Sequence, residues 1–485
     1  MAGFRKHGRG EKEDLLAYIR NGKELTTGQK LILVTKLSAP AIMAQLTSIA
    51  MQYIDASMVG RMGANSSAAI GLVSTTTWLF GGICSSGAAG FSIQVAQYIG
   101  AKNYEKAREV LRQSLVAILL FSMTLMMLGI SVSAFLPAWL GGAREIRKEA
   151  MGYFVVYACS LPAAGINRLA GSMLQCSGNM KVPSILNSCM CLLDVIFNAL
   201  LIFPGVTVSV LGWSLAIPGA GLGVIGAALG TALAQLVTAC LMLYFLCVRS
   251  EILCLHRGES YRMRADCIKR AVRISLPIAF EHGVVCGAMI MATKIVAPLG
   301  IIAIAANSFA VTAESLCYMP GYGIADAATT LTGQSVGAGR SRLALSFGKI
   351  TVSFGMLIMA CSGMFMYFAA PFMIGILTPD ASVRALGIRI LRIEAFAEPL
   401  YGASIVATGV LRGAGDTLVP SIMNLVSMWA VRLPLSYFLS KQHGLTGVWI
   451  AMCIELCFRG CIFLIRIARK RWLKTHQLLV GVNSN

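Results

Sequence analysis

The sequence has few charged residues for its length. Only 13% of its 485 residues are Asp, Glu, Lys or Arg, whereas soluble globular proteins carry roughly 25%. Acidic residues are the scarcer kind, 21 against 41 basic ones. The chain also contains no HExxH sequence and no phosphate-binding GxxxxGK[ST] loop. These absences argue against a soluble fold, a zinc hydrolase and an ATP-driven pump, and we expect no enzymatic activity.

The other compositional signals exclude two further classes. The 15 cysteines are scattered through apolar stretches without a pair of CxxC motifs, so we expect apolar filler rather than zinc ligands. The formal net charge of +20 could indicate nucleic-acid binding, but the basic residues lie between apolar stretches instead of forming one patch. The first 29 residues are polar and have no apolar core with a cleavage site, so we expect no cleaved signal peptide.

Apolar stretches long enough to cross a bilayer of about 30 Å recur along the chain. Hydrophobic residues make up 56% of the sequence. We therefore predict an all-α integral membrane protein with about twelve transmembrane helices. The expected spans are 30–57, 66–96, 112–138, 150–172, 184–204, 221–248, 272–298, 303–333, 345–377, 385–410, 420–440 and 445–467.

Basic residues cluster at places that twelve spans would put on one side of the membrane. These places are the N-terminal segment, residues 102–112, the linker after the sixth span, Arg340 with Arg342, and residues 466–474. Because loops rich in Lys and Arg stay in the cytoplasm, we expect both termini there and the protein in the cell membrane. Arg144, Arg147 and Lys148 fall on the other side and are a small exception.

The second half of the chain repeats the first at a constant offset, which Pro40 and Pro277 define as 277 − 40 = 237. The same offset relates Gln97 to Gln334, Gly100 to Gly337, Ser184 to Ser421 and Asn187 to Asn424. Matches of Pro, Gln, Gly and Asn in one register are not expected by chance, even in so apolar a chain. We predict a cytoplasmic segment 1–29, two pseudo-symmetric six-helix lobes over 30–248 and 272–467, a cytoplasmic linker 249–271 and a cytoplasmic tail 468–485.

An even number of spans per repeat means that both copies enter the membrane from the same side. They are then related by an axis along the membrane normal. Parallel repeats of this kind are typical of secondary transporters, which bind substrate between the halves and alternate access by rocking.

Polar stripes within the first-half spans are the leading candidates for function, because polar and ionisable groups are costly at membrane depth. Gln52 and Asp55 lie on one face of the first span, and Asn187, Asp194 and Asn198 lie on one face of the fifth. Asp55 and Asp194 could hold a proton, or a desolvated Na⁺ together with nearby amide and hydroxyl oxygens. Alternatively, Asp55 lies in water at the outer helix end and Asp194 makes only a packing hydrogen bond.

The second half has its own acids. Glu281 lies in the seventh span, Glu314 in the eighth, and Glu394, Glu398 and Tyr401 at i, i+4 and i+7 in the tenth. Carboxylates and aromatic rings that face one cavity would suit an organic cation through charge and cation–π attraction. A tyrosine can equally lie at the membrane interface.

Two other features of the spans are interpreted more simply. Glu455 and Arg459 lie at i and i+4 and are predicted to form a structural ion pair. Arg432, also within a span, could extend toward the interface or neutralise an acid.

Several motifs resemble the multidrug and toxic compound extrusion (MATE) family of transporters. They are Asp55-Ala-Ser-Met-Val-Gly-Arg-Met-Gly63, the repeated Gln97-Tyr-Ile-Gly-Ala101 and Gln334-Ser-Val-Gly-Ala338, and Leu411-Arg-Gly-Ala-Gly-Asp416 followed by Val419-Pro420. The resemblance covers roughly residues 30–470. It implies twelve helices in two V-shaped lobes and the export of organic cations in exchange for H⁺ or Na⁺, as in bacterial members.

The resemblance also implies site residues. Asp55, Asp194 and Thr231 fall on positions similar to the family's N-lobe cation site, and Glu281 falls where one branch carries a seventh-helix acid. The sequence departs from that pattern at Met190, where an Asn is expected, and at Tyr401, where an Asp is expected.

We therefore predict a secondary antiporter, acting as a monomer, that needs no cofactor beyond the coupling ion and binds no nucleic acid. The nearest rival is a flippase for lipid-linked precursors from the same broad superfamily, which should have a basic central cavity and often extra helices. A membrane-embedded enzyme would need clustered catalytic or metal ligands, and the sequence contains none.

Overall fold

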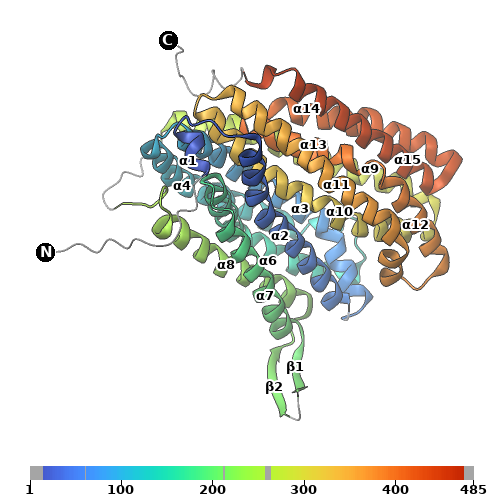
Figure 1. The fold of residues 1–485 in the computed structure, drawn as a ribbon. Helices are drawn as coiled ribbons and strands as arrows, with labels where there is room; N and C mark the ends of the chain where they lie inside the picture. Colours follow the sequence, from blue (N-terminus) through green and yellow to red (C-terminus); the bar gives the residue numbers. More distant parts are fainter. Residues whose placement is uncertain (1–14, 61, 211–212, 257–263, 474–485) are drawn as a thin grey trace.

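The N-terminal half folds into a bundle of long helices with one outer hairpin. The computed structural model describes residues 15–60, 62–210, 213–256 and 264–473 (Figure 1). The elements of this half are α1 (Leu15–Arg20), α2 (Thr27–Gly60), α3 (Ala64–Gly100), α4 (Tyr104–Ser133), α5 (Leu136–Trp139), α6 (Arg144–Cys176), α7 (Lys181–Ile202), the antiparallel strands β1 (Pro204–Val210) and β2 (Trp213–Ala220), α8 (Gly223–Tyr244) and the π-helix η1 (Phe245–Arg249).

The C-terminal half repeats this bundle without a hairpin in its described part. Its elements are α9 (Ala265–Val296), η2 (Ala297–Leu299), α10 (Ile301–Gly337), α11 (Ser341–Leu377), α12 (Ala381–Glu394), α13 (Glu398–Gly413), α14 (Leu418–Val426), the π-helix η3 (Ser427–Arg432), α15 (Leu433–Ala468) and η4 (Arg471–Leu473). Figure 1 shows the two bundles side by side, with the hairpin projecting from the end opposite α1.

The helices account for twelve spans. Ten helical segments of the described chain are long and apolar enough to cross a membrane. One of these, Leu418–Ala468, is 51 residues long and is interrupted at Gly444, so it supplies two spans. The tandem of α12 and α13 supplies the twelfth, because each part alone is too short. The predicted all-α membrane fold with about twelve helices is confirmed.

The tenth predicted span is broken into two helices. We expected one helix over 385–410, but residues 395–397 separate α12 from α13. Pro399 has no backbone N–H, so the carbonyl of Ala395 cannot receive the next helical hydrogen bond there. The helix of the seventh predicted span, α9, begins at Ala265, seven residues before the predicted start of that span at 272.

Each lobe has its own apolar core, and apolar side chains also cover the outside. In the N-lobe Leu111 and Met173 are fully buried, and in the C-lobe Val406 and Phe463 are fully buried. On the outer face of α11, by contrast, Phe368 is 73% exposed. A helix that is apolar on both faces is expected where one side meets protein and the other meets lipid.

The lobes meet at the ends of α3 and α10 through two reciprocal hydrogen bonds. Gln97 Nε2 donates to the carbonyl of Gly413 in the C-lobe (3.2 Å), and Gln334 Nε2 donates to the carbonyl of Cys176 in the N-lobe (2.8 Å). Both donor and acceptor pairs differ by the repeat offset, since 334 − 97 and 413 − 176 both equal 237. The repeated motif therefore closes one end of the lobe interface with pseudo-twofold symmetry.

Two glycines of the same motif make this contact possible. A Cβ atom on Gly100 would lie 2.1 Å from the carbonyl oxygen of Gln334, and one on Gly337 would lie 1.9 Å from that of Gln97. Any side chain would push the two helices apart. The short helix α1 packs at the same end, where Arg340 Nη1 donates to the carbonyl of Lys23 (2.9 Å).

Candidate functional site

The first-half acids predicted from sequence come together. Asn198 of α7 donates through Nδ2 to Asp55 Oδ1 of α2 (3.0 Å) and to Asp194 Oδ2 one turn earlier on α7 (3.0 Å). Asp194 and Asn198 are fully buried, and Asp55 is half-buried. The helical spacing predicted that Asp194 and Asn198 share a face, and the packing of α2 on α7 places Asp55 opposite them.

The cluster has more acceptors than donors. Asp194 Oδ1 and Asn198 Oδ1 are buried and accept no hydrogen bond from the protein. None of the ion pairs among the described residues involves Asp55 or Asp194. Buried polar atoms normally have partners, so an arrangement of acid oxygens without donors is suited to a proton or a small cation.

Thr231 and Tyr153 complete the surroundings of the acids. The Thr231 hydroxyl of α8 lies beside the Asp194 carboxylate, while it donates to the carbonyl of Ala227 (3.2 Å) in this conformation. Tyr153 of α6 lies within electrostatic range of both acids, and its role was not predicted because its span carries no matching polar stripe.

Gln52 and Asn187 are not part of this cluster. Gln52 is exposed, and Asn187 lies two turns from Asp194 on α7 without a recorded contact to either acid in the described structure. Their helical spacing was compatible with the stripe, but neither side chain reaches the acids, although α2 and α7 stay in contact from the Ser184 hydroxyl at Pro40 to the Asn198 amide at Asp55.

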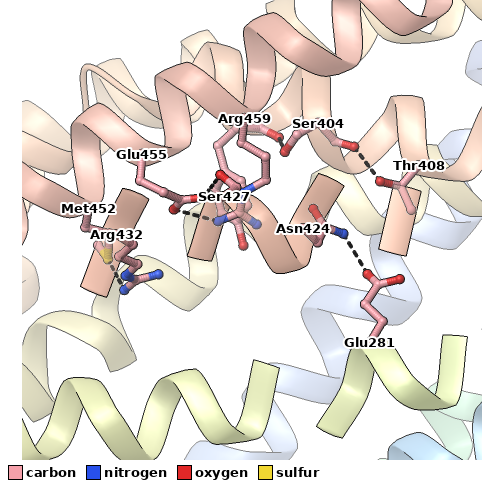
Figure 2. Close-up of polar contacts among 10 residues, drawn as sticks. Glu281, Ser404, Thr408, Asn424, Ser427, Arg432, Met452, Glu455 and Arg459 are labelled. Carbon is pink, nitrogen blue, oxygen red and sulfur yellow. Dashed lines mark hydrogen bonds and ion pairs between the residues drawn. The ribbon is translucent and has the colours of Figure 1, made fainter. Parts of the chain in front are cut away.

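Glu281 has a complete set of partners in the C-lobe. Its carboxylate accepts from Arg412 Nη2 (3.0 Å), Ser421 Oγ (2.9 Å) and Asn424 Nδ2 (2.7 Å), and Figure 2 shows the Asn424 amide directed at it. The Arg412 guanidinium neutralises its charge. Glu281 is therefore the centre of a structural network in this conformation, rather than an open cation ligand.

The predicted pair of Glu455 and Arg459 is present and is extended by a hydroxyl. Arg459 Nε and Nη2 lie 2.8 Å from the two carboxylate oxygens of Glu455, and Ser427 Oγ also donates to this carboxylate. Arg432 Nη2 lies 2.5 Å from Met452 Sδ (Figure 2). No carboxylate in the described structure forms an ion pair with Arg432.

The remaining C-lobe acids are sealed inside the bundle. Glu394 and Glu398 are 0% exposed and Glu314 is 6% exposed. All four carboxylate oxygens of Glu394 and Glu398 lack a hydrogen-bond partner. We expected these acids to face an open substrate cavity, but in this conformation the surrounding helices cover them.

Three tyrosines, among them the predicted Tyr401, gather on the side of these acids. The Tyr318 ring lies 6.0 Å from that of Tyr322 and 5.6 Å from that of Tyr401, centroid to centroid. The Arg459 guanidinium stacks over the Tyr401 ring at 5.6 Å. Tyr401, at the position where an acid was expected from the family resemblance, thus already holds a cation of the protein itself.

Two charged residues at the lobe interface were missed by the sequence analysis. Arg168 is the one charged residue between Glu149 and the end of α6, and Asp326 lies in the last third of α10. Both are ionisable groups within predicted spans, so the sequence carried the signal that could have identified them.

Residues 333–337 match a Gly-x-Ser-x-Gly pattern, which in hydrolases lies on a strand-to-helix turn. Here these residues lie within α10, and Ser335 is fully buried, so the pattern does not form a nucleophile site.

Comparison with known proteins agrees with this architecture. The MatE family model matches residues 40–200 and 277–438, two segments that begin 237 residues apart. The chain is 24% identical to the probable multidrug resistance protein NorM of Thermotoga maritima over 90% of this chain and 92% of that protein. It is also 24% identical to the multidrug resistance protein PmpM of Pseudomonas aeruginosa, over 91% and 92% of the two chains.

Solved structures share the fold. A crystal structure of MATE in complex with MaL6 has a TM-score of 0.86 at 20% identity and covers 95% of this chain and 99% of that one. An outward-facing multidrug resistance MATE family transporter has a TM-score of 0.84 at 20% identity over 93% and 100% of the two chains. The resemblance inferred from the repeated motifs is confirmed: the chain belongs to the MatE family and is a multi-span membrane transporter, not an enzyme.

Proposed function

We propose that this chain is a secondary active antiporter that exports organic cations in exchange for H⁺ or Na⁺ by alternating access. One observation carries the proposal: Asp55 and Asp194 share the single amide donor Asn198, and no ion pair of the described residues neutralises them. Acids at membrane depth that lack a basic partner are suited to capture and release a small cation. The names of the multidrug resistance relatives support an organic substrate.

The reciprocal hydrogen bonds of Gln97 and Gln334 would control when one end of the lobe interface opens during the transport cycle. They hold the lobes together at one end of the interface, and access from that end requires that both break. A ligand shifts such an equilibrium only if it binds the two states with different affinity. A cation bound between Asp55 and Asp194 removes the repulsion of two close carboxylates, lets α2 and α7 pack more closely and so favours the state that releases substrate outward.

The same proposal includes the location, the partners and the oligomeric state of the transporter. It works in the cytoplasmic membrane with both termini in the cytoplasm, and its partners are the lipid bilayer and small organic cations. It acts as a monomer, with the coupling ion in place of a cofactor and without a nucleic-acid partner.

Ethidium efflux from proteoliposomes under separately imposed Na⁺ and pH gradients tests this function. The wild type should respond to one of the gradients, and Asp55→Asn and Asp194→Asn should reduce efflux to the leak of protein-free liposomes while the purified proteins stay monodisperse. Glu149→Gln, which removes an exposed acid of α6, is the matched control and should retain wild-type efflux. Full gradient-driven efflux in both Asp variants would refute the proposal.

The alternative is a flippase for lipid-linked precursors. It would use the lobe interface for a lipid headgroup and would not need paired acids in the N-lobe. Ethidium efflux that responds to neither gradient, in a protein that still binds anionic lipid headgroups, would favour it.

A further inference from the structure

Arg168 is a charged side chain at membrane depth without a structural role in its own bundle. It precedes the end of α6 at Cys176 by two turns, or about 12 Å at 1.5 Å per residue. Its side chain is exposed, and no hydrogen bond or ion pair within the described structure holds it. An arginine within a membrane-spanning helix is costly, so its presence there indicates a function.

Asp326 of α10 lies opposite Arg168, across the interface between the lobes. Two contacts fix the register of α6 and α10: Thr330 Oγ1 donates to the carbonyl of Gln175 (3.2 Å), and Gln334 Nε2 donates to that of Cys176. Asp326 is one turn before Thr330, and Arg168 is two turns before Gln175. Both side chains therefore lie just beyond the point where the helices separate, offset by about 4.5 Å along the axis.

The two charges face each other without pairing. They lie within electrostatic range, and the Gln45 amide of α2 is within hydrogen-bonding reach of Asp326, but none of the ion pairs among the described residues joins Arg168 to Asp326. Arg168 is exposed and Asp326 is half-buried, so both side chains are accessible in this conformation.

The other charged groups near Arg168 and Asp326 have partners of their own. Arg412 of α13 is neutralised by Glu281 of α9, and His282 of α9 stacks edge-on against Trp78 of α3. Cys84 of α3 and Tyr157 of α6 are the remaining titratable neighbours of Arg168. One free positive pole and one free negative pole remain.

We propose that Arg168 and Asp326 are the two poles of a substrate site for organic zwitterions, molecules that carry both a cationic nitrogen and a carboxylate. Asp326 attracts the cationic nitrogen, and the Arg168 guanidinium takes the carboxylate in a two-pronged hydrogen bond, the geometry for which arginine is suited. A cation without a carboxylate would give Arg168 no partner and would be repelled by its positive charge. The proposal rests on the proposed export function and names its substrate class.

Binding of a matched pair of fluorescent probes tests the inference. The probes are a rhodamine dye as its free carboxylic acid and as its ethyl ester, measured by fluorescence polarisation on the full-length protein in detergent. We expect wild type to bind the acid about tenfold more tightly than the ester, the size expected of one charge-assisted hydrogen bond. Arg168→Gln should lower the acid-to-ester ratio about tenfold, and Arg168→Lys should lower it less.

Arg144→Gln is the control, because it removes an exposed arginine from the first turn of the same helix and should keep the wild-type ratio. Asp326→Asn should weaken both probes, since both contain the cationic nitrogen. Equal affinity of wild type for acid and ester, an Arg168→Gln variant that weakens both probes equally, or no binding of either probe would overturn the inference. No ion gradient is present, so failure of the coupling proposal leaves this result unaffected and is detected separately by the efflux assay.

Discussion

The two lobes share one scaffold, but they differ in how they hold two of their acids. In the N-lobe, Asp55 and Asp194 share an amide and have no base. In the C-lobe, Glu281 and Glu455 each have an arginine within 3.0 Å. Duplication thus preserved the backbone, while substitution left Asp55 and Asp194 of one lobe without a base and tied Glu281 and Glu455 of the other into fixed networks.

Corresponding positions show how this divergence arose. Ser184 and Asn187 of the N-lobe correspond to Ser421 and Asn424, which hold Glu281, whereas 281 − 237 is position 44, an alanine. Near the end of each half, Gly223 corresponds to Gly447, an offset of 224. That offset places Thr231 and Gln235 at Glu455 and Arg459. Thr231, beside Asp194, and Gln235, one turn later on α8, are thus replaced by a complete ion pair in the C-lobe.

The largest difference between the lobes is expected when one asparagine in each is replaced. Asn198→Leu removes the single donor that the two N-lobe acids share, so gradient-driven ethidium efflux should fall close to the leak rate. Asn424→Leu leaves Glu281 with Arg412 and Ser421, so most of the efflux should persist. Equal losses in the two variants would show that the lobes do not differ in this way.

A second test compares stability at matched positions of α8 and α15. Arg459→Leu leaves the fully buried carboxylate of Glu455 without its partner, and loss of one partner of a buried pair costs about 3 to 5 kcal/mol. Gln235→Leu removes only a half-buried amide and should have a much smaller effect. Thermal unfolding in detergent measures both, and the double variant Glu455→Met with Arg459→Leu should recover stability. A double variant as unstable as the single one would contradict this explanation.

The smallest effect is expected at the reciprocal hydrogen bonds between the lobes, to which each lobe contributes one glutamine. Gln97→Leu and Gln334→Leu each remove one reciprocal hydrogen bond, worth about 1 kcal/mol, and should open that end of the interface about fivefold more often. The alkylation rate of Cys176, followed by mass spectrometry, measures the opening, with buried Cys84 as the internal control. Unequal effects of the two substitutions would indicate that the interface does not open symmetrically.

The sequence predicted much of the fold and part of the candidate site. The spans, the repeat and the grouping of Asp194 with Asn198 depend on local periodicity, which a single chain displays directly. The break between α12 and α13 was missed because Pro399 also fits a kinked continuous helix. The N-lobe and C-lobe roles of the acids stay predictions, although the structure sharpens them: Gln52 and Asn187 fall outside the acid cluster, and Glu314, Glu394 and Glu398 are covered.

Residue types and spacing alone determined that this chain crosses the membrane about twelve times, in two related halves with acids at membrane depth. Hydropathy and helical periodicity are properties of neighbouring residues, so no knowledge of packing was needed. Only the tertiary structure decided which acid meets a base: Glu281 and Arg412 are 131 residues apart, and Arg168 and Asp326 face each other from different lobes. Which residues meet depends on how whole helices cross, and a shift of one helical turn would exchange a neutralised acid for a free one.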